Sequence, residues 1–151
     1  MMKGNRMKLT FKRLRENAVI PVRATAESAG LDLSACLDEP VIIPPHEIRL
    51  IPTGLAAALD RCDAMLMLCA RSGLAAKHGI GMANGVGIVD TDYRGEICVP
   101  LINQSSVPFE ITNGMRIAQL ITVPVYLPET AEADTLPETA RGAGGFGSTG
   151  R

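Results

Sequence analysis

Short apolar runs separated by turn residues dominate the chain up to residue 125. Prolines and Asn-Gly pairs interrupt these runs at intervals that suit strands rather than long helices. Many short strands with turn signals between them predict an all-β fold of the jelly-roll, sandwich or barrel type. The runs predicted as strands cover residues 8–14, 31–35, 41–43, 48–53, 65–70, 86–89, 96–102, 108–111 and 117–125.

One segment has helical character. Residues 72–78 are predicted to form the single short helix of the fold, with Ser72 as its N-cap and Gly79 as its C-terminal stop. A helix of this length needs tertiary packing to be stable. We therefore expect residues 1–126 to form one β domain with a jelly-roll-like barrel or sandwich architecture.

The character of the sequence changes after this domain. Leu-Pro-Glu-Thr-Ala occurs at 127–131 and again at 136–140, and the acidic residues of this stretch have no basic counterpart. Proline stiffens such a segment and acids keep it solvated, so residues 127–140 are predicted to be a linker. Residues 141–151 are rich in glycine and carry one aromatic ring, two hydroxyls and two arginines. They are expected to form a flexible arm that closes the active site of a neighbouring subunit.

Composition narrows the function classes. Hydrophobic residues make up 46% of the chain and aromatic residues 3%, so the core must be aliphatic. A net charge of −1 gives no general attraction to nucleic acid or to an anionic membrane. No apolar run approaches the ~18 residues of a spanning helix, and a cytoplasmic location is expected. The four cysteines form no CxxC pair, which argues against a zinc site and predicts buried, reduced thiols.

The segment 89–96, Val-Asp-Thr-Asp-Tyr-Arg-Gly-Glu, is the strongest internal signal for chemistry. If the preceding strand continued, Asp90 and Asp92 would share one face; if the chain turned, which Gly95 permits, they would diverge. A carboxylate at the end of a buried strand can orient and deprotonate a water molecule. An Asp-rich hairpin turn is the alternative interpretation.

Three further places suggest anion binding or a buried ionic network. Arg71 and Ser72 stand where a strand meets the helix, and backbone N–H groups there favour an anion; a plain cap and a surface ion pair would give the same pattern. Gln119 lies among apolar residues and needs a ligand, water or protein partner if it is buried. Asp32 lies inside an apolar strand, where it requires either a cation, such as an arginine of the same core, or a metal-bound water.

Together these residues supply acids, arginines, hydroxyls, an amide and a ring, without a redox group or a cluster of metal ligands. That set suits hydrolysis of a phosphoanhydride. Mg²⁺ is expected as the cofactor, held by the substrate phosphates and water with no direct protein ligand, because it retains waters and binds phosphate oxygens.

Five segments, in order and spacing, resemble the motifs of the trimeric deoxyuridine triphosphatases (dUTPases). They are AGLDLSA at 29–35, ARSGLA at 70–75, NGVGIVDTDYRGEI at 84–97, GMRIAQLI at 114–121 and RGAGGFGSTG at 141–150. The resemblance spans nearly the whole chain. It departs from the family pattern at Ala70, where the family usually has proline before Arg-Ser-Gly.

The resemblance implies a β jelly-roll homotrimer whose active sites lie between subunits and hydrolyse dUTP to dUMP and pyrophosphate with Mg²⁺. Such an enzyme limits uracil incorporation into DNA and supplies dUMP for dTMP synthesis. By similarity, Asp90 activates the water that attacks the α-phosphorus, Tyr93 packs on the deoxyribose, and Phe146 stacks on the base. Asp32 and Arg116 are expected to support the site structurally.

The resemblance also implies the remaining substrate contacts. The base-and-sugar contacts are Asn84, Gly87, Ile88, Val89, Asp90, Tyr93, Cys98 and Phe146. The phosphate contacts are Arg71, Ser72, Gly73, Gln119, Arg141, Ser148 and Thr149.

Two other functions fit parts of the pattern. A dCTP deaminase shares the fold and several motifs, but its chemistry requires a glutamate at the cytosine amine. Its motif also usually has a second Ser after Arg-Ser, where this chain has Gly73. A non-catalytic nucleotide-sensing module is expected to have lost Asp90 or the tail, and both are intact.

Overall fold

The computed structural model describes residues 7–145, and its regular structure in that range consists of antiparallel strands and one short helix. The strands are β1 (Leu9–Arg13), β2 (Leu31–Ser34), β3 (Val41–Ile43), β4 (Ile48–Pro52), β5 (Leu55–Leu59), β6 (Ala64–Ala70), β7 (Ile80–Met82), β8 (Gly87–Val89), β9 (Cys98–Asn103), β10 (Phe109–Ile111) and β11 (Arg116–Pro124), and the helix is α1 (Ser72–His78). The prediction of an all-β fold with a short helix is confirmed.

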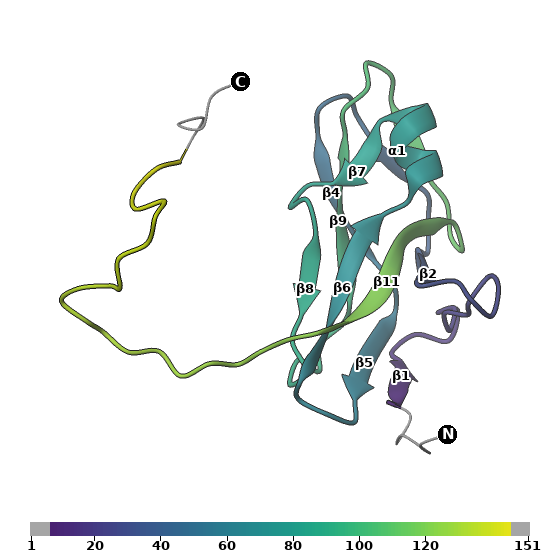
Figure 1. Cartoon of the computed structure of the whole chain (residues 1–151). Helices are drawn as coiled ribbons and strands as arrows, with labels where there is room; N and C mark the ends of the chain where they lie inside the picture. The colour runs from purple at the N-terminus through teal and green to yellow at the C-terminus, as the bar shows by residue number, and fades with distance from the viewer. Residues whose placement is uncertain (1–6, 146–151) are drawn as a thin grey trace.

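Two sheets form most of the body of the molecule (Figure 1). The larger has the strand order β2-β11-β6-β8, and the smaller has the order β4-β9-β7. Two-stranded ribbons, β1-β5 and β10-β3, complete the body. Strands far apart in the sequence pair with each other, as β2 does with β11 and β1 with β5, which is typical of a jelly roll.

Burial alternates along the central strands of both sheets. The side chains that point into the core are Ala64, Leu66 and Leu68 of β6 and Val99, Leu101 and Asn103 of β9. A period of two is the pattern of a strand with one face against a core. Fully burying one such aliphatic side chain contributes about 1.5–3 kcal/mol, so the aliphatic core expected from composition holds the two sheets together.

The predicted strand boundaries agree with the structure to within one or two residues, but two strands were not predicted. β5 was missed because its sequence, Leu-Ala-Ala-Ala-Leu, is rich in the best helix former. The pairing of Leu55–Leu59 with β1 overrides that preference. β7 was missed because three residues with a central Gly81 carry almost no periodicity.

The helix α1 has the predicted bounds and the predicted end. Gly79 takes the left-handed conformation at φ 67° and donates its N–H to the carbonyls of Ala75 and Leu74. The prediction that Ser72 is the N-cap is wrong: Arg71 holds that position, with no hydrogen bond from its side chain to the helix. Arg71 is not a capping residue type, and its guanidinium is engaged elsewhere, as described below.

The prediction that the thiols are buried is correct for one cysteine of four, Cys36. All four are free; Cys36 is buried, Cys69 and Cys98 are half-buried, and Cys62 is exposed in the turn between β5 and β6. Cys62 is exposed because it lies between Arg61 and Asp63 in a surface turn.

The chain leaves the body after β11 and runs away from it as an extended segment (Figure 1). Every residue of the predicted linker, 127–140, is exposed. No helix in the range 7–145 is long and apolar enough to cross a membrane.

Candidate active site

A cleft of about 400 Å³ lies where the edge strand β8 approaches β4 and β9. Seven of the predicted base-and-sugar contacts line it, namely Asn84, Gly87, Ile88, Val89, Asp90, Tyr93 and Cys98. Its other lining residues are Leu50, Leu68, Glu96, Ile97 and Pro100. The structure thus brings one continuous motif of the sequence together with residues from three other strands, β4, β6 and β9.

The backbone of β8 gives the cleft its polar wall. β8 pairs with β6 on one side and has no second partner among the strands of residues 7–145. An edge strand leaves alternate N–H and C=O groups unpaired, and these can pair with the edge of a planar base. Gly87 lets β8 lie close to Leu68 of β6, because a Cβ at position 87 would lie 3.0 Å from Leu68 Cβ.

The segment after β8 turns rather than continuing as a strand. The N–H of Tyr93 donates to the carbonyl of Asp90 at 3.2 Å. Asp90 lines the cleft while Asp92 does not, although both line a second hollow beside Met65 and Val125. The chain thus forms an Asp-rich turn that places the exposed Asp90 at the cleft, and the role of Asp90 in activating water stays a prediction.

Tyr93 is held against this turn. Its hydroxyl donates to the carbonyl of Glu96 at 3.0 Å. A Cβ at Gly95 would overlap the Tyr93 ring, so glycine is required for the ring to lie there. The ring is half exposed and forms a flat wall of the cleft.

Cys98 presents a neutral thiol to the cleft. Burial raises the pKa of this thiol above its ordinary value, and the nearby charge of Glu96 raises it further, against a smaller opposing effect of Arg15. The group is therefore protonated at neutral pH, which suits a site for an uncharged base.

Five lining residues of the cleft were not predicted from the sequence. Glu96 and Ile97 belong to the motif at 84–97, so proximity to Asp90 was a usable signal. Pro100 shares a face with Cys98 by the period of two in β9. Leu50 had no local signal, because it reaches the cleft through the register of β4 with β9.

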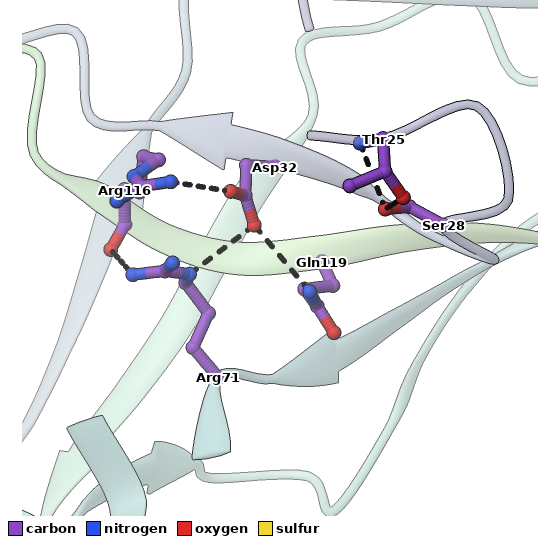
Figure 2. A network of polar contacts seen from close by, with 6 residues as sticks. All are labelled: Thr25, Ser28, Asp32, Arg71, Arg116 and Gln119. Carbon is purple, nitrogen blue, oxygen red and sulfur yellow. Dashed lines mark hydrogen bonds and ion pairs between the residues drawn. The ribbon is translucent and has the colours of Figure 1, made fainter. Parts of the chain in front are cut away.

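A second group of predicted residues gathers around Asp32 (Figure 2). Arg71 Nε lies 3.2 Å from Asp32 Oδ1, and Arg116 Nη1 lies 3.0 Å from Asp32 Oδ2. Gln119 Nε2 donates to Oδ1 at 3.4 Å, and Arg71 Nη1 donates to the carbonyl of Arg116 at 3.3 Å. Asp32 thus has arginine partners, as one of the sequence alternatives stated, and Gln119 has a protein partner.

Burial differs among the members of this Asp32 cluster. The Asp32 side chain is 14% exposed, that of Arg71 24% and that of Arg116 57%. A mostly buried carboxylate requires compensation, and two guanidinium groups provide it. The guanidinium of Arg71 keeps donors in excess of those that Asp32 uses, so the cluster can still bind an anion.

Ser72 and Gly73 follow Arg71 at the start of α1 and are exposed. A Cβ at Gly73 would meet nothing within 4 Å, so space is open beside these backbone N–H groups. The first N–H groups of a helix have no partner within the helix. This junction therefore offers donors next to the Asp32 cluster.

The loop before β2 shows an interaction that was not predicted. Thr25 and Ser28 join through their hydroxyls at 2.8 Å, and the N–H of Thr25 donates to Ser28 Oγ at 3.1 Å (Figure 2). The Thr-x-x-Ser spacing was a usable signal for this turn. It shapes the chain that enters β2 just before Asp32.

Asp90 lies far from the Asp32 cluster within one chain. Val89 pairs with Leu66, so Asp90 follows at the level of Met65, with which it lines a common hollow. Arg71 follows the other end of β6, six residues further on. At about 3.3 Å per residue, Asp90 and Arg71 are separated by roughly 20 Å along β6.

The hydrogen bonds that the structure describes for residues 141–145 of the predicted arm are local, with partners no more than three residues away. Arg141 is exposed, and its Nε donates to the carbonyl of Gly144 at 2.7 Å. Phe146, Ser148 and Thr149 lie outside the described residues.

The donor chemistry of the site suits phosphate better than direct metal ligation. Within residues 7–145 no three His, Cys, Asp or Glu side chains gather closely enough to hold a metal ion. Around Asp32 the available groups are N–H donors, and both carboxylate oxygens already accept hydrogen bonds. A Mg²⁺ ion fits here when phosphate oxygens carry it.

Comparison with known proteins identifies the family. A family model described as dUTPase matches residues 16–150. The chain belongs to the dUTPase family. The deoxyuridine 5′-triphosphate nucleotidohydrolase of Desulfitobacterium hafniense is 48% identical over 149 residues, which cover 99% of both chains. The enzyme class expected from the five motifs, dUTP diphosphatase, is confirmed at the level of the family.

Solved structures of the family share the fold. The dUTPase of Staphylococcus bacteriophage 80alpha with dUPNHPP has a TM-score of 0.85 and 26% identity, covering 95% of this chain and 99% of that one. A mutant dUTPase from phage phi11 of S. aureus, described with a structural Mg(II) ion, has a TM-score of 0.78 and 23% identity over 87% of this chain and 99% of that one. The jelly-roll-like fold class is thereby confirmed.

Proposed function

We propose that this chain hydrolyses dUTP to dUMP and pyrophosphate by attack of water on the α-phosphorus. Asp90 accepts a proton from the water, the new bond forms between water oxygen and α-phosphorus, and the bridging oxygen leaves with pyrophosphate. The observation that carries this proposal is the position of the exposed Asp90 carboxylate at the mouth of the 400 Å³ cleft, directly after the edge strand β8.

The cleft is proposed to bind the base and the sugar. Free backbone groups of Gly87, Ile88 and Val89 would pair with the polar edge of uracil, with Asn84 and Cys98 beside them. Cytosine would present a donor where uracil presents an acceptor, and a site built on such hydrogen bonds rejects the mismatched base by about 10⁴–10⁵. The Tyr93 ring would pack on the deoxyribose and leave no room for a 2′-hydroxyl.

The Asp32 cluster is proposed to bind the phosphates. Arg71, Ser72, Gly73 and Gln119 would donate to phosphate oxygens, while Asp32 and Arg116 hold Arg71 in place. Fixed donors of this kind stabilise the charge that develops in phosphoryl transfer. Residues 141–151 are proposed as an arm on the linker 127–140, with Arg141, Ser148 and Thr149 clamping the triphosphate and Phe146 stacking on the base.

The separation of the two regions supports a shared site and a homotrimer. A nucleotide whose base lies in the cleft has its phosphates next to Asp90, roughly 20 Å from Arg71 of the same chain. The phosphate donors must then come from a second subunit, and the arm on its exposed linker would serve a third. A closed cyclic assembly of three identical chains meets this requirement. The body that assembles is residues 1–126.

Mg²⁺ is proposed as the cofactor. When bound, it would neutralise phosphate charge, and phosphate oxygens and water would hold it. The residues of this chain orient the substrate and take the proton. A cytoplasmic location, the absence of a nucleic-acid partner, and the roles in limiting uracil in DNA and supplying dUMP remain predictions from the sequence.

The test is pyrophosphate release from dUTP, dCTP, dTTP and UTP, each with Mg²⁺ and with a chelator. We expect release from dUTP with Mg²⁺ and little from the other three. Cytosine mismatches the hydrogen bonds of the cleft, the methyl group of thymine would meet its backbone wall, and UTP carries the 2′-hydroxyl that Tyr93 excludes. Ammonia release from dCTP would instead support the deaminase alternative. Binding of dUTP without turnover would support the sensing module.

A further inference from the structure

Glu96 is a half-buried carboxylate of the cleft that the proposed reaction does not use. Its Oε1 accepts a hydrogen bond from the N–H of Gly54 at 2.7 Å. Gly54 lies in the turn between β4 and β5, far from Glu96 in the sequence. The contact therefore ties the segment that carries Asp90 and Tyr93 to the turn that joins β4 and β5, two strands of different sheets.

Gly54 is a rigid anchor for this contact. It is buried with φ 68°, in the left-handed region that favours glycine. A Cβ on Gly54 would lie 2.7 Å from Cys36 Sγ and 2.8 Å from Ala18 Cβ, so the backbone is packed directly against the core. Its carbonyl accepts from the N–H of Leu14 at 2.8 Å. The direction of its N–H is therefore fixed.

The residues on either side of Gly54 hold the same segment. Thr53, which is fully buried, donates its hydroxyl to the carbonyl of Ile97 at 2.6 Å. The N–H of Ile97 donates to the carbonyl of Leu55 at 2.8 Å. Residues 53–55 thus form hydrogen bonds with Glu96 and Ile97 through both backbone and side-chain groups.

The other end of the contact reaches Tyr93, whose hydroxyl donates to the Glu96 carbonyl at 3.0 Å. We propose that Glu96 is a positioning residue which, through its hydrogen bond with Gly54, sets the depth of the Tyr93 ring in the cleft and thereby the preference for deoxyribonucleoside over ribonucleoside triphosphates. The proposal rests on the function proposed above, in which Tyr93 excludes the 2′-hydroxyl.

The length of the Glu96 side chain matters more than its charge for the proposed positioning of Tyr93. Exclusion of a 2′-hydroxyl is steric, and an error of about 1 Å in the position of a group at the site has a large effect on rate. A glutamine at position 96 keeps an oxygen at the same reach, whereas an aspartate keeps the charge but is one methylene too short for the Gly54 N–H.

The experiment compares Glu96→Gln with Glu96→Asp and measures kcat/KM for dUTP and for UTP. We expect Glu96→Asp to reduce the ratio of the two values about tenfold, and Glu96→Gln to leave it within about threefold of the wild type. Glu110→Gln, on the exposed face of β10, is the matched control and should leave the ratio unchanged. The ratio does not depend on the fraction of folded enzyme, so a merely structural role would not move it.

A second variant keeps the proposal testable if substitution of Glu96 prevents the protein from folding. Tyr93→Phe keeps the ring but removes the donor to the Glu96 carbonyl, and it should reduce the same ratio. An unchanged ratio in Glu96→Asp, or an equal reduction in Glu96→Asp and Glu96→Gln, would overturn the positioning role. Failure of the wild-type chain to hydrolyse dUTP would be a different result, since it would refute the proposed function and this inference together.

Discussion

The cleft beside β8 and the Asp32 cluster are built in opposite ways. The cleft takes most of its residues from one continuous stretch, 84–98, and its polar wall is backbone. The Asp32 cluster joins β2, the end of β6 and β11 through side-chain charges. Backbone at a fixed edge suits recognition of a neutral base, whereas guanidinium groups around a carboxylate suit a flexible, charged phosphate chain.

Of the changes that test this comparison, removal of the proposed general base, Asp90, should have the largest effect on turnover. Asp90→Asn keeps the shape of the cleft but cannot accept the proton, and a general base contributes about 10²–10⁴ in rate. We expect pyrophosphate release to fall by that factor while affinity for a non-hydrolysable dUTP analogue, measured by calorimetry, is retained. Full turnover in this variant would refute the role of Asp90.

Co-expression of two inactive variants tests whether the two regions of one active site come from different subunits. Asp90→Asn and Arg71→Ala alter different regions, so if each site combines the two regions from different subunits, co-assembled trimers contain some intact sites. Random assembly should restore roughly a quarter of the wild-type activity, as assessed after co-expression. No recovery would mean that both regions of one chain serve the same site.

Truncation after Ala140 should have the next largest effect. It removes the proposed arm but leaves both regions of the body, and loss of a charge-stabilising donor set costs about 10²–10³ in turnover. We expect the sedimentation behaviour of the truncated protein to match that of the full chain. Unchanged turnover would count against a closing arm.

Substitution within the Asp32 cluster should have a smaller, mixed effect. Asp32→Ala leaves two guanidinium groups without their carboxylate, and we expect a loss of about 1–2 kcal/mol in the free energy of unfolding, limited because Arg116 is largely exposed. Urea unfolding measures this, and turnover should fall because Arg71 loses its support. Glu110→Ala, an exposed acid on β10, is the control for loss of one negative charge.

The smallest predicted effect concerns the thiol in the cleft. Because burial raises the pKa of Cys98, its alkylation at neutral pH should be slower than that of the exposed Cys62 and should accelerate at pH values above the usual range for thiols. A dUTP analogue should protect Cys98 and not Cys62, as peptide mass mapping can show. Equal protection of both would place the nucleotide elsewhere.

Local patterns predicted much of this molecule. The strand runs, the bounds of α1 and the stop at Gly79 follow from periodicity and from the conformational freedom of glycine. The lining of the cleft was predictable because most of it is one motif. The strand β5 was not predictable, because its alanines favour a helix. Pairing with Lys12 and its neighbours in β1 overrides that preference.

Long-range contacts were beyond local patterns. Leu50 enters the cleft through its register with Pro100, and Gly54 meets Glu96 across 42 positions of sequence. The sequence left two alternatives for Asp32, an arginine or a metal-bound water, and the tertiary structure places Arg71 and Arg116 beside it. Such pairings depend on strand register, which residues near in sequence do not encode.

The sequence by itself determined the family, the all-β architecture and the part of the cleft lining that comes from one motif, because each depends on residue types at short, regular spacing. Only the tertiary structure decided that Asp90 and Arg71 lie at opposite ends of β6 and that Glu96 is tied to Gly54. Both facts arise from the antiparallel pairing of distant strands, which sets distances that no single segment contains.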